Sequence, residues 1–215
     1  MTNKKSILSR EQINSVMTLY SNGHFQKAIK MIKELNTNYP NVPLLFNLIG
    51  ACYKELGQLE GASKMFENAV NIKPDYSEAH FNLGAMHNAL GRKTTAIGCY
   101  KKAIELTPNY PDAHNNLGSL LHDLGYLHEA LESLEWAIAY RPNFAEALNN
   151  LGRVLGDMGR IEKSIDSFKK AISLKPNYAN AYFNLSSAFQ DLGDIDSCLH
   201  SISITPVSYT HLRAH

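Results

Sequence analysis

The chain has 215 residues, of which 44% are hydrophobic, and its 21 lysines and arginines nearly balance its 20 aspartates and glutamates. This balance gives no overall field to attract nucleic acid or an anionic membrane, and no apolar run approaches membrane-spanning length. The N-terminus lacks the apolar core of a signal peptide, and the three cysteines form no CxxC pair, which fits a reducing compartment. We therefore expect a cytoplasmic protein with no nucleic-acid partner and no membrane partner.

Prolines and glycines recur along the whole chain with a period of 34 residues. The prolines are Pro40, Pro74, Pro108, Pro142 and Pro176, and the glycines are Gly23, Gly57, Gly91, Gly125, Gly159 and Gly193. A period of this length is typical of stacked helical hairpins. The glycine suits the end of a first helix that must turn sharply, and the proline ends the second helix. The sequence thus predicts an all-α solenoid of helix-turn-helix repeats.

Numbering each repeat so that its proline is position 32 divides the chain into three parts. Residues 1–8 are an N-terminal lead, residues 9–205 are the repeat array, and residues 206–215 are a tail. The repeats begin at Ser9, Pro43, Ser77, Pro111, Ala145 and Ala179, and the last is incomplete. The first repeat opens with Ser9 and Gln12, a capping-box pair that predicts the start of a helix.

Small and large residues alternate at fixed places in the repeat. Positions 8, 20 and 27 are mostly Gly, Ala or Ser, and positions 7, 11 and 24 are mostly large. Small residues let two helices approach closely, and a bulky side chain there would overpack at a cost of about 1–3 kcal/mol. We expect the large residues at positions 7, 11 and 24 to fill the space between the helices.

This pattern resembles the tetratricopeptide repeat (TPR) over nearly all of residues 9–205. The resemblance implies a right-handed superhelical solenoid. It also implies that the first helices of successive repeats line a concave groove and expose positions 2, 5, 6, 9, 12 and 13 there.

Asparagines recur at two of these groove positions. They are Asn47, Asn115 and Asn149 at position 5, and Asn82, Asn116, Asn150 and Asn184 at position 6. An Asn side chain offers a donor and an acceptor, so a ladder of them could bind both peptide groups of an extended backbone. The ladder resembles that in the repeats of the O-linked N-acetylglucosamine transferase family, where it holds a polypeptide. The alternative is that these residues are exposed and idle.

Acidic residues dominate two other groove positions. They are Glu78, Asp112 and Glu146 at position 2, and Glu55, Asp123, Asp157 and Asp191 at position 13. Bases are few, Lys54 and Arg153. Such a groove would favour a neutral or basic peptide. Alternatively, these are solvated charges that contribute little.

The sequence offers no pattern for catalysis, a cofactor or a metal site. His80, His87 and His114 lack a second ligand at helical spacing, so we expect structural histidines in or near the packed interface. Trp136 falls at a position that is polar in other repeats, and we expect it to be exposed on a second helix.

The end of the chain does not continue the repeat. Val207–His215 reads VSYTHLRAH and resembles a translated sequencing adapter, so we treat residues 206–215 as non-native. The sixth repeat loses its pattern after Cys198, and we expect the native chain to be cut short here.

Together these features predict a non-enzymatic protein-interaction scaffold that binds an extended peptide or partner segment in a TPR groove. One alternative is the substrate-recruiting N-terminal region of a larger enzyme of the glycosyltransferase or sulfotransferase type. Another is self-association through the uncapped C-terminal repeat, because an unsolvated end exposes apolar surface.

Overall fold

The computed structural model describes residues 8–194 and 196–198, which form eleven α-helices and no β-strand. The chain separates into two compact units, with the boundary between Pro108 and Asn109. The lead up to residue 7, the sixth repeat after Cys198 and the tail at 206–215 lie outside the described residues.

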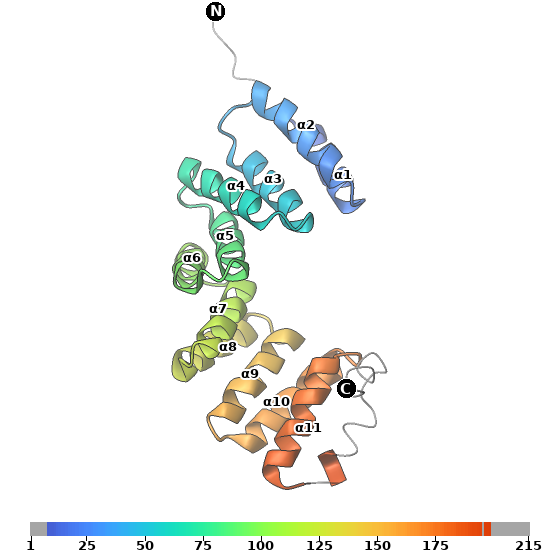
Figure 1. Cartoon of the computed structure of the whole chain (residues 1–215), viewed down its shortest axis with the longest axis vertical. Helices are drawn as coiled ribbons and strands as arrows, with labels where there is room; N and C mark the ends of the chain where they lie inside the picture. The colour runs from blue at the N-terminus through green and yellow to red at the C-terminus, as the bar shows by residue number, and fades with distance from the viewer. Residues whose placement is uncertain (1–7, 195, 199–215) are drawn as a thin grey trace, which may run out of the picture. The chain divides into compact units, whose positions relative to one another are not determined.

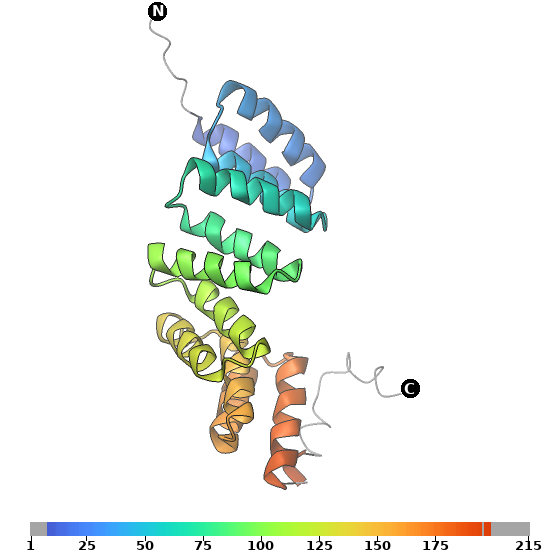
Figure 2. The same ribbon diagram turned by 60° about the vertical axis from the view of Figure 1, so that its left-hand side comes forward.

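Unit 1 consists of three helical hairpins, which follow one another in sequence order (Figure 1). Their helices are α1 (Arg10–Ser21), α2 (Phe25–Asn38), α3 (Pro43–Glu55), α4 (Leu59–Ile72), α5 (Ser77–Ala89) and α6 (Lys93–Leu106). Each hairpin packs on the next through α2 with α3 and α4 with α5, as Figure 2 shows from another side.

Unit 2 repeats the arrangement with two hairpins and one further first helix. Its helices are α7 (Pro111–Asp123), α8 (Leu127–Tyr140), α9 (Ala145–Asp157), α10 (Ile161–Leu174) and α11 (Ala179–Leu192). The first helices lie side by side, because α9 contacts both α7 and α11 (Figure 1). Helical hairpins repeated in this order confirm the predicted fold class.

The turns follow the residues that mark the period. The recurring glycines, such as Gly159 with φ of 73°, adopt the left-handed conformation just after a first helix. Second helices end two residues before each recurring proline, as α10 ends at Leu174 ahead of Pro176. Ser9 and Gln12 form the expected capping box at the start of α1, with bonds of 3.2 and 2.9 Å.

Close approach of the two helices in a hairpin depends on glycine at position 8. A Cβ atom on Gly152 would lie 2.5 Å from Cε1 of Phe168, and one on Gly118 would lie 2.7 Å from Cγ of Leu134. Phe168 is only 2% exposed, so its ring fills the space that the glycine leaves. The large side chain of position 24 thus packs directly on the glycine of position 8.

The hydrophobic core continues from each repeat into its neighbour. In unit 1, Phe66 of α4 packs with Leu83 and Met86 of α5. In unit 2, Phe168 of α10 packs with Leu185 and Phe189 of α11. No repeat can therefore bury its apolar face alone.

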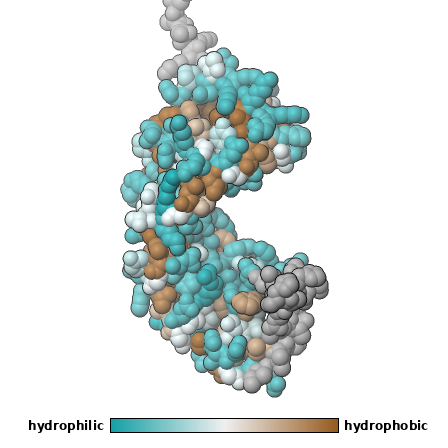
Figure 3. All heavy atoms as spheres, in the orientation of Figure 1, coloured by the Kyte–Doolittle hydropathy of each residue, from teal (hydrophilic) through white to brown (hydrophobic). Residues whose placement is uncertain are grey.

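The surface turned to the viewer in Figure 3 is mostly hydrophilic, and apolar residues appear in separate patches. Trp136 is 47% exposed on α8, as expected, and its ring stacks on that of Tyr140 with centroids 5.5 Å apart.

Candidate functional site

One geometric rule relates neighbouring first helices within each unit. Most of the hydrogen-bonded side chains on them lie 35 residues apart in sequence, which is one repeat plus one residue. A position in one repeat therefore faces the next higher position in the following repeat. The same offset joins the hydroxyl of Tyr20 to Glu55 at 3.3 Å, from α1 to α3.

The asparagines of positions 5 and 6 form pairs through this offset. The Nδ2 groups of Asn82, Asn150 and Asn184 donate to the Oδ1 atoms of Asn47, Asn115 and Asn149 at 3.1, 2.9 and 2.9 Å. The two rows of asparagines are thus hydrogen-bonded layers and not parallel, independent contacts.

The expectation that position 5 is exposed is wrong. Asn47, Asn115 and Asn149 are only 3%, 8% and 4% exposed, because the next first helix covers each of them. A buried amide requires hydrogen bonds, and the position-6 residue above supplies one. Asn47 also donates to Glu78 at 3.0 Å, and Asn115 donates to Asn116 at 3.3 Å.

Position 6 is the layer that faces solvent. Asn82, Asn116, Asn150 and Asn184 are all partly exposed. In each of the three pairs, one N–H of the position-6 amide bonds the residue below it. The other N–H and the carbonyl oxygen then remain for water or a ligand.

The acidic residues of position 2 all have hydrogen-bond partners, and two of them are paired with bases. Arg141 forms a bidentate pair with Asp112 at 3.0 and 2.6 Å, and Lys175 donates to Glu146 at 2.8 Å. Both bases lie just after a second helix and reach back to the first helix of their own repeat. The third acid, Glu78, accepts the bond from Asn47.

In these pairs the hydrogen bonds stabilise the charged forms of Glu146 and Arg141. The hydrogen bond from Lys175 lowers the pKa of Glu146, and the hydrogen bond to Asp112 raises the pKa of Arg141. The guanidinium of Arg141 also lies over the Phe144 ring, 4.5 Å from its centroid, and the ammonium of Lys175 lies 4.7 Å from the centroid of Tyr178.

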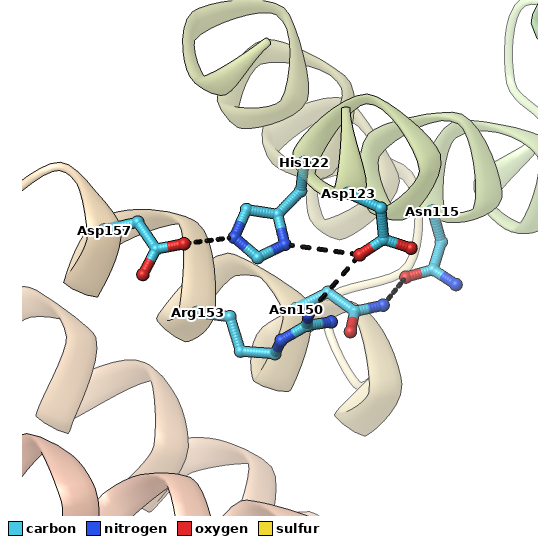
Figure 4. Close-up of polar contacts among 6 residues, drawn as sticks. All are labelled: Asn115, His122, Asp123, Asn150, Arg153 and Asp157. Carbon is cyan, nitrogen blue, oxygen red and sulfur yellow. Dashed lines mark hydrogen bonds and ion pairs between the residues drawn. The ribbon is translucent and has the colours of Figure 1, made fainter. Parts of the chain in front are cut away.

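A second polar cluster joins α7 to α9 (Figure 4). Nε2 of His122 lies 2.7 Å from Oδ2 of Asp157, and Nδ1 lies 3.8 Å from Oδ1 of Asp123. Arg153 approaches the same Asp123 oxygen at 3.5 Å, so this base is also paired. The side chain of His122 is only 8% exposed, and its Nδ1 has no hydrogen bond.

Beside this cluster is a cavity of about 280 Å³, which we call the α9–α11 pocket. Its polar lining comes from His122, Arg153, Asp157, Asn184, Ser187 and Asp191. Ile161, Phe168 and Ala188 give it an apolar wall. Four residues that the sequence placed in the groove thus meet in one place, namely Arg153, Asp157, Asn184 and Asp191.

His122 did not stand out in the sequence, although a signal for it exists. It occupies position 12 and Asp157 occupies position 13 of the next repeat, which is the offset that also joins Tyr20 to Glu55. Once the one-residue offset is known, the repeat numbering therefore predicts that His122 and Asp157 lie together.

The histidines that the sequence singled out have structural environments. His87 and His114 are 7% and 8% exposed, and His80 lies 2.9 Å from the carbonyl oxygen of Pro74. Within residues 8–194 and 196–198, no group of three or more His, Cys, Asp or Glu side chains could hold a metal ion.

Taken together, the period, the helical hairpins and the partly exposed face of first helices define a helical-repeat protein of the scaffold class. The chain belongs to the tetratricopeptide repeat family. The TPR repeat profile matches residues 50–91, 86–125, 118–159 and 154–193, which together cover more than half of the chain. Family and fold thus support a protein-interaction scaffold.

Solved structures agree with this assignment. The crystal structure of MamA is 28% identical, with a TM-score of 0.67 over 73% of this chain and 91% of that one. YrrB, described as a TPR protein with an unusual peptide-binding site, is 23% identical, with a TM-score of 0.66 over 83% of this chain and 91% of its own. PilW, a type IV pilus biogenesis factor, is 20% identical with a TM-score of 0.83 over 97% of both chains. At these last two identities the likeness shows the fold alone.

No curated protein sequence matches the chain significantly. In the part of the chain that the structure describes, no helix combines the length and the apolar character that crossing a bilayer requires.

Proposed function

We propose that the first helices of unit 2 bind an extended polypeptide segment, without catalysis, through the asparagines of position 6. The single observation that carries the proposal is the layered pairing of asparagines. Asn115 and Asn149 are buried and accept from Asn150 and Asn184, each at 2.9 Å. The buried layer thereby fixes the orientation of the exposed amides before any ligand arrives.

Such fixed amides suit a peptide backbone. Each amide still has one N–H donor and one carbonyl acceptor free. These can pair with the carbonyl oxygen and the N–H of a peptide group. Because the bonds go to main-chain atoms, this recognition would tolerate many sequences. Orientation in advance also reduces the entropy lost on binding. YrrB, described as having a peptide-binding site, offers a precedent in the same fold.

The test compares peptide binding by the full chain and by the double variant Asn150→Ala, Asn184→Ala. Fluorescence anisotropy with a labelled library of unstructured 15-residue peptides measures affinity. Loss of two to four hydrogen bonds, each worth about 0.5–1.5 kcal/mol, should weaken the tightest peptides about tenfold or more.

Asn71→Ala is the matched control, because Asn71 is an exposed asparagine on α4, a second helix. It should leave every affinity unchanged, and circular dichroism should show that all variants are folded. Equal affinities for the double variant and the control would overturn the proposal.

We also propose a cytoplasmic location. Cys52, Cys99 and Cys198 are all free thiols, which fits a reducing compartment.

A further inference from the structure

The α9–α11 pocket has the size of a subsite for one side chain. At about 280 Å³ it falls just below the range of about 300–1,000 Å³ that is usual for whole small-molecule ligands. Asn184 is part of its wall and also belongs to the asparagine pairs. A polypeptide held by Asn150 and Asn184 would therefore pass directly over the opening of the pocket.

The charges around the pocket are mostly negative. Asp157 and Asp191 line it, and Asp123 stands behind His122, against the single guanidinium of Arg153. Three carboxylates and one guanidinium leave the set net negative whether the imidazole is neutral or protonated. Arg153 is already paired with Asp123, so it does not neutralise the other two acids.

Helix ends add to this potential. Asp157 is the last residue of α9, and Asp191 is the last but one of α11. The C-terminus of a helix carries a partial negative charge that favours a nearby cation. Asp191 has no ion pair or hydrogen bond with the other described residues, so its carboxylate is available.

His122 lies at the edge of the pocket and holds one of its carboxylates, because Nε2 lies 2.7 Å from Oδ2 of Asp157. The His122 side chain is 92% buried at the edge of the pocket, since 8% is exposed, and Nδ1 lacks a hydrogen bond. When Nε2–H donates to Asp157, the neutral ring leaves Nδ1 as a buried acceptor. Nδ1 is buried on the side of Asp123, so a cation in the pocket would meet the Asp157 carboxylate that the ring positions.

We infer that the α9–α11 pocket accepts a lysine or arginine side chain of the bound polypeptide. The aliphatic stem would lie along Ile161, Phe168 and Ala188, and the charged head would meet Asp157 and Asp191. This inference rests on the proposed function, and it adds that the partner segment carries a basic residue.

The experiment uses the full chain and 13-residue host peptides of alternating Ser and Ala with one central residue varied. The central residue is Lys, Arg, norleucine or Glu, and anisotropy in 50 mM salt measures affinity. Norleucine keeps the aliphatic stem without the charge. We expect Lys and Arg peptides to bind about fivefold more tightly than norleucine, which corresponds to about 1 kcal/mol for an exposed charge pair. The Glu peptide should bind most weakly.

Asp191→Asn should abolish the preference for Lys over norleucine and leave the affinity for norleucine unchanged. Asp166→Asn is the matched control, because Asp166 is an exposed acid on α10 that does not line the pocket. It should keep the preference. Salt at 0.5 M should reduce the preference, because it screens exposed charges.

The outcomes separate the two proposals. Lys and norleucine peptides that bind equally, yet still depend on Asn150 and Asn184, would overturn the basic subsite alone. An Asp191→Asn variant that retains the preference would also overturn it. Failure of every peptide to bind would overturn both the subsite and the proposed function.

Discussion

At the residue scale, two buried histidines differ in how close an acidic partner lies to the ring. His87 on α5 and His122 on α7 are both largely buried, and in each the Nδ1 atom lacks a hydrogen bond. His122 has a strong partner in Asp157 at 2.7 Å, whereas the nearest acid to His87, Glu67, is 4.0 Å away. Burial therefore dominates at His87 and lowers the pKa of its imidazole, with Arg92 acting in the same direction against Glu67.

The lowered pKa of His87 predicts a loss of stability in mild acid. Above the unfolded-state value of about 6.5, the ring is neutral in both states and has no effect on the pH dependence. Below that value the unfolded chain takes up the proton first, so the free energy of unfolding falls as pH falls. This loss continues down to the folded pKa. Urea unfolding of the wild type and of His87→Gln at pH 7.5, 6.5 and 5.5 measures it.

The variant should lose less stability than the wild type between pH 7.5 and 5.5. His24→Gln, which alters an exposed histidine just before α2, is the control for the remaining titrating groups. Parallel pH profiles for the wild type and His87→Gln would contradict the prediction.

The sequence could predict which residue types lie at the candidate site but not which of them are buried. Positions 5 and 6 both carry asparagine, and composition does not distinguish a buried amide from an exposed one. Depth depends on the next first helix, which covers Asn149 and leaves Asn184 partly open. Only a known stacking offset of one residue resolves the two layers.

At the element scale, the hairpin itself was predictable. Glycine, alanine and large residues recur at fixed positions, and close helix packing demands that pattern. The pairing of acids was not predictable from the first helices alone. Arg141 and Lys175 lie in the turns after the second helices, 29 residues from Asp112 and Glu146, so local spacing did not reveal the pairs.

Packing between the helices of one hairpin gives a second prediction. Gly152→Ala should lower the free energy of unfolding by about 1–3 kcal/mol, because the added methyl group would overlap the Phe168 ring. The ring is only 2% exposed and packs on Leu185 and Phe189, so it cannot shift without disturbing that core. Thermal and urea unfolding measure the change.

The matched control is Gly98→Ala on α6. Nothing lies within 4 Å of a Cβ atom built on Gly98, which is exposed in the interior of its helix. Alanine there should raise stability by about 0.5–1 kcal/mol through helix propensity. Equal effects of the two substitutions would show that the close contact at Gly152 has no energetic weight.

At the scale of the whole molecule, stability comes from packing between helices that are close in sequence. Helix contacts in the described residues join elements that are adjacent or next but one in sequence, as α9 contacts α8, α10, α7 and α11. In such an array the free energy is close to a sum of repeat terms and interface terms. A local defect should therefore stay local.

Amide hydrogen exchange of Gly152→Ala tests this. Exchange should accelerate in α9 and α10 and, to a lesser extent, in α8 and α11, because these share the damaged packing. Helices α1 to α4 of unit 1 should keep their wild-type rates, since the packing damaged by the substitution is that of α9 and α10 in unit 2. The matched experiment uses Gly50→Ala, whose Cβ would lie 2.6 Å from Phe66, and it should give the converse pattern. A uniform acceleration in every helix would instead mean that the chain unfolds as one cooperative block, and the nearest-neighbour account would then be wrong.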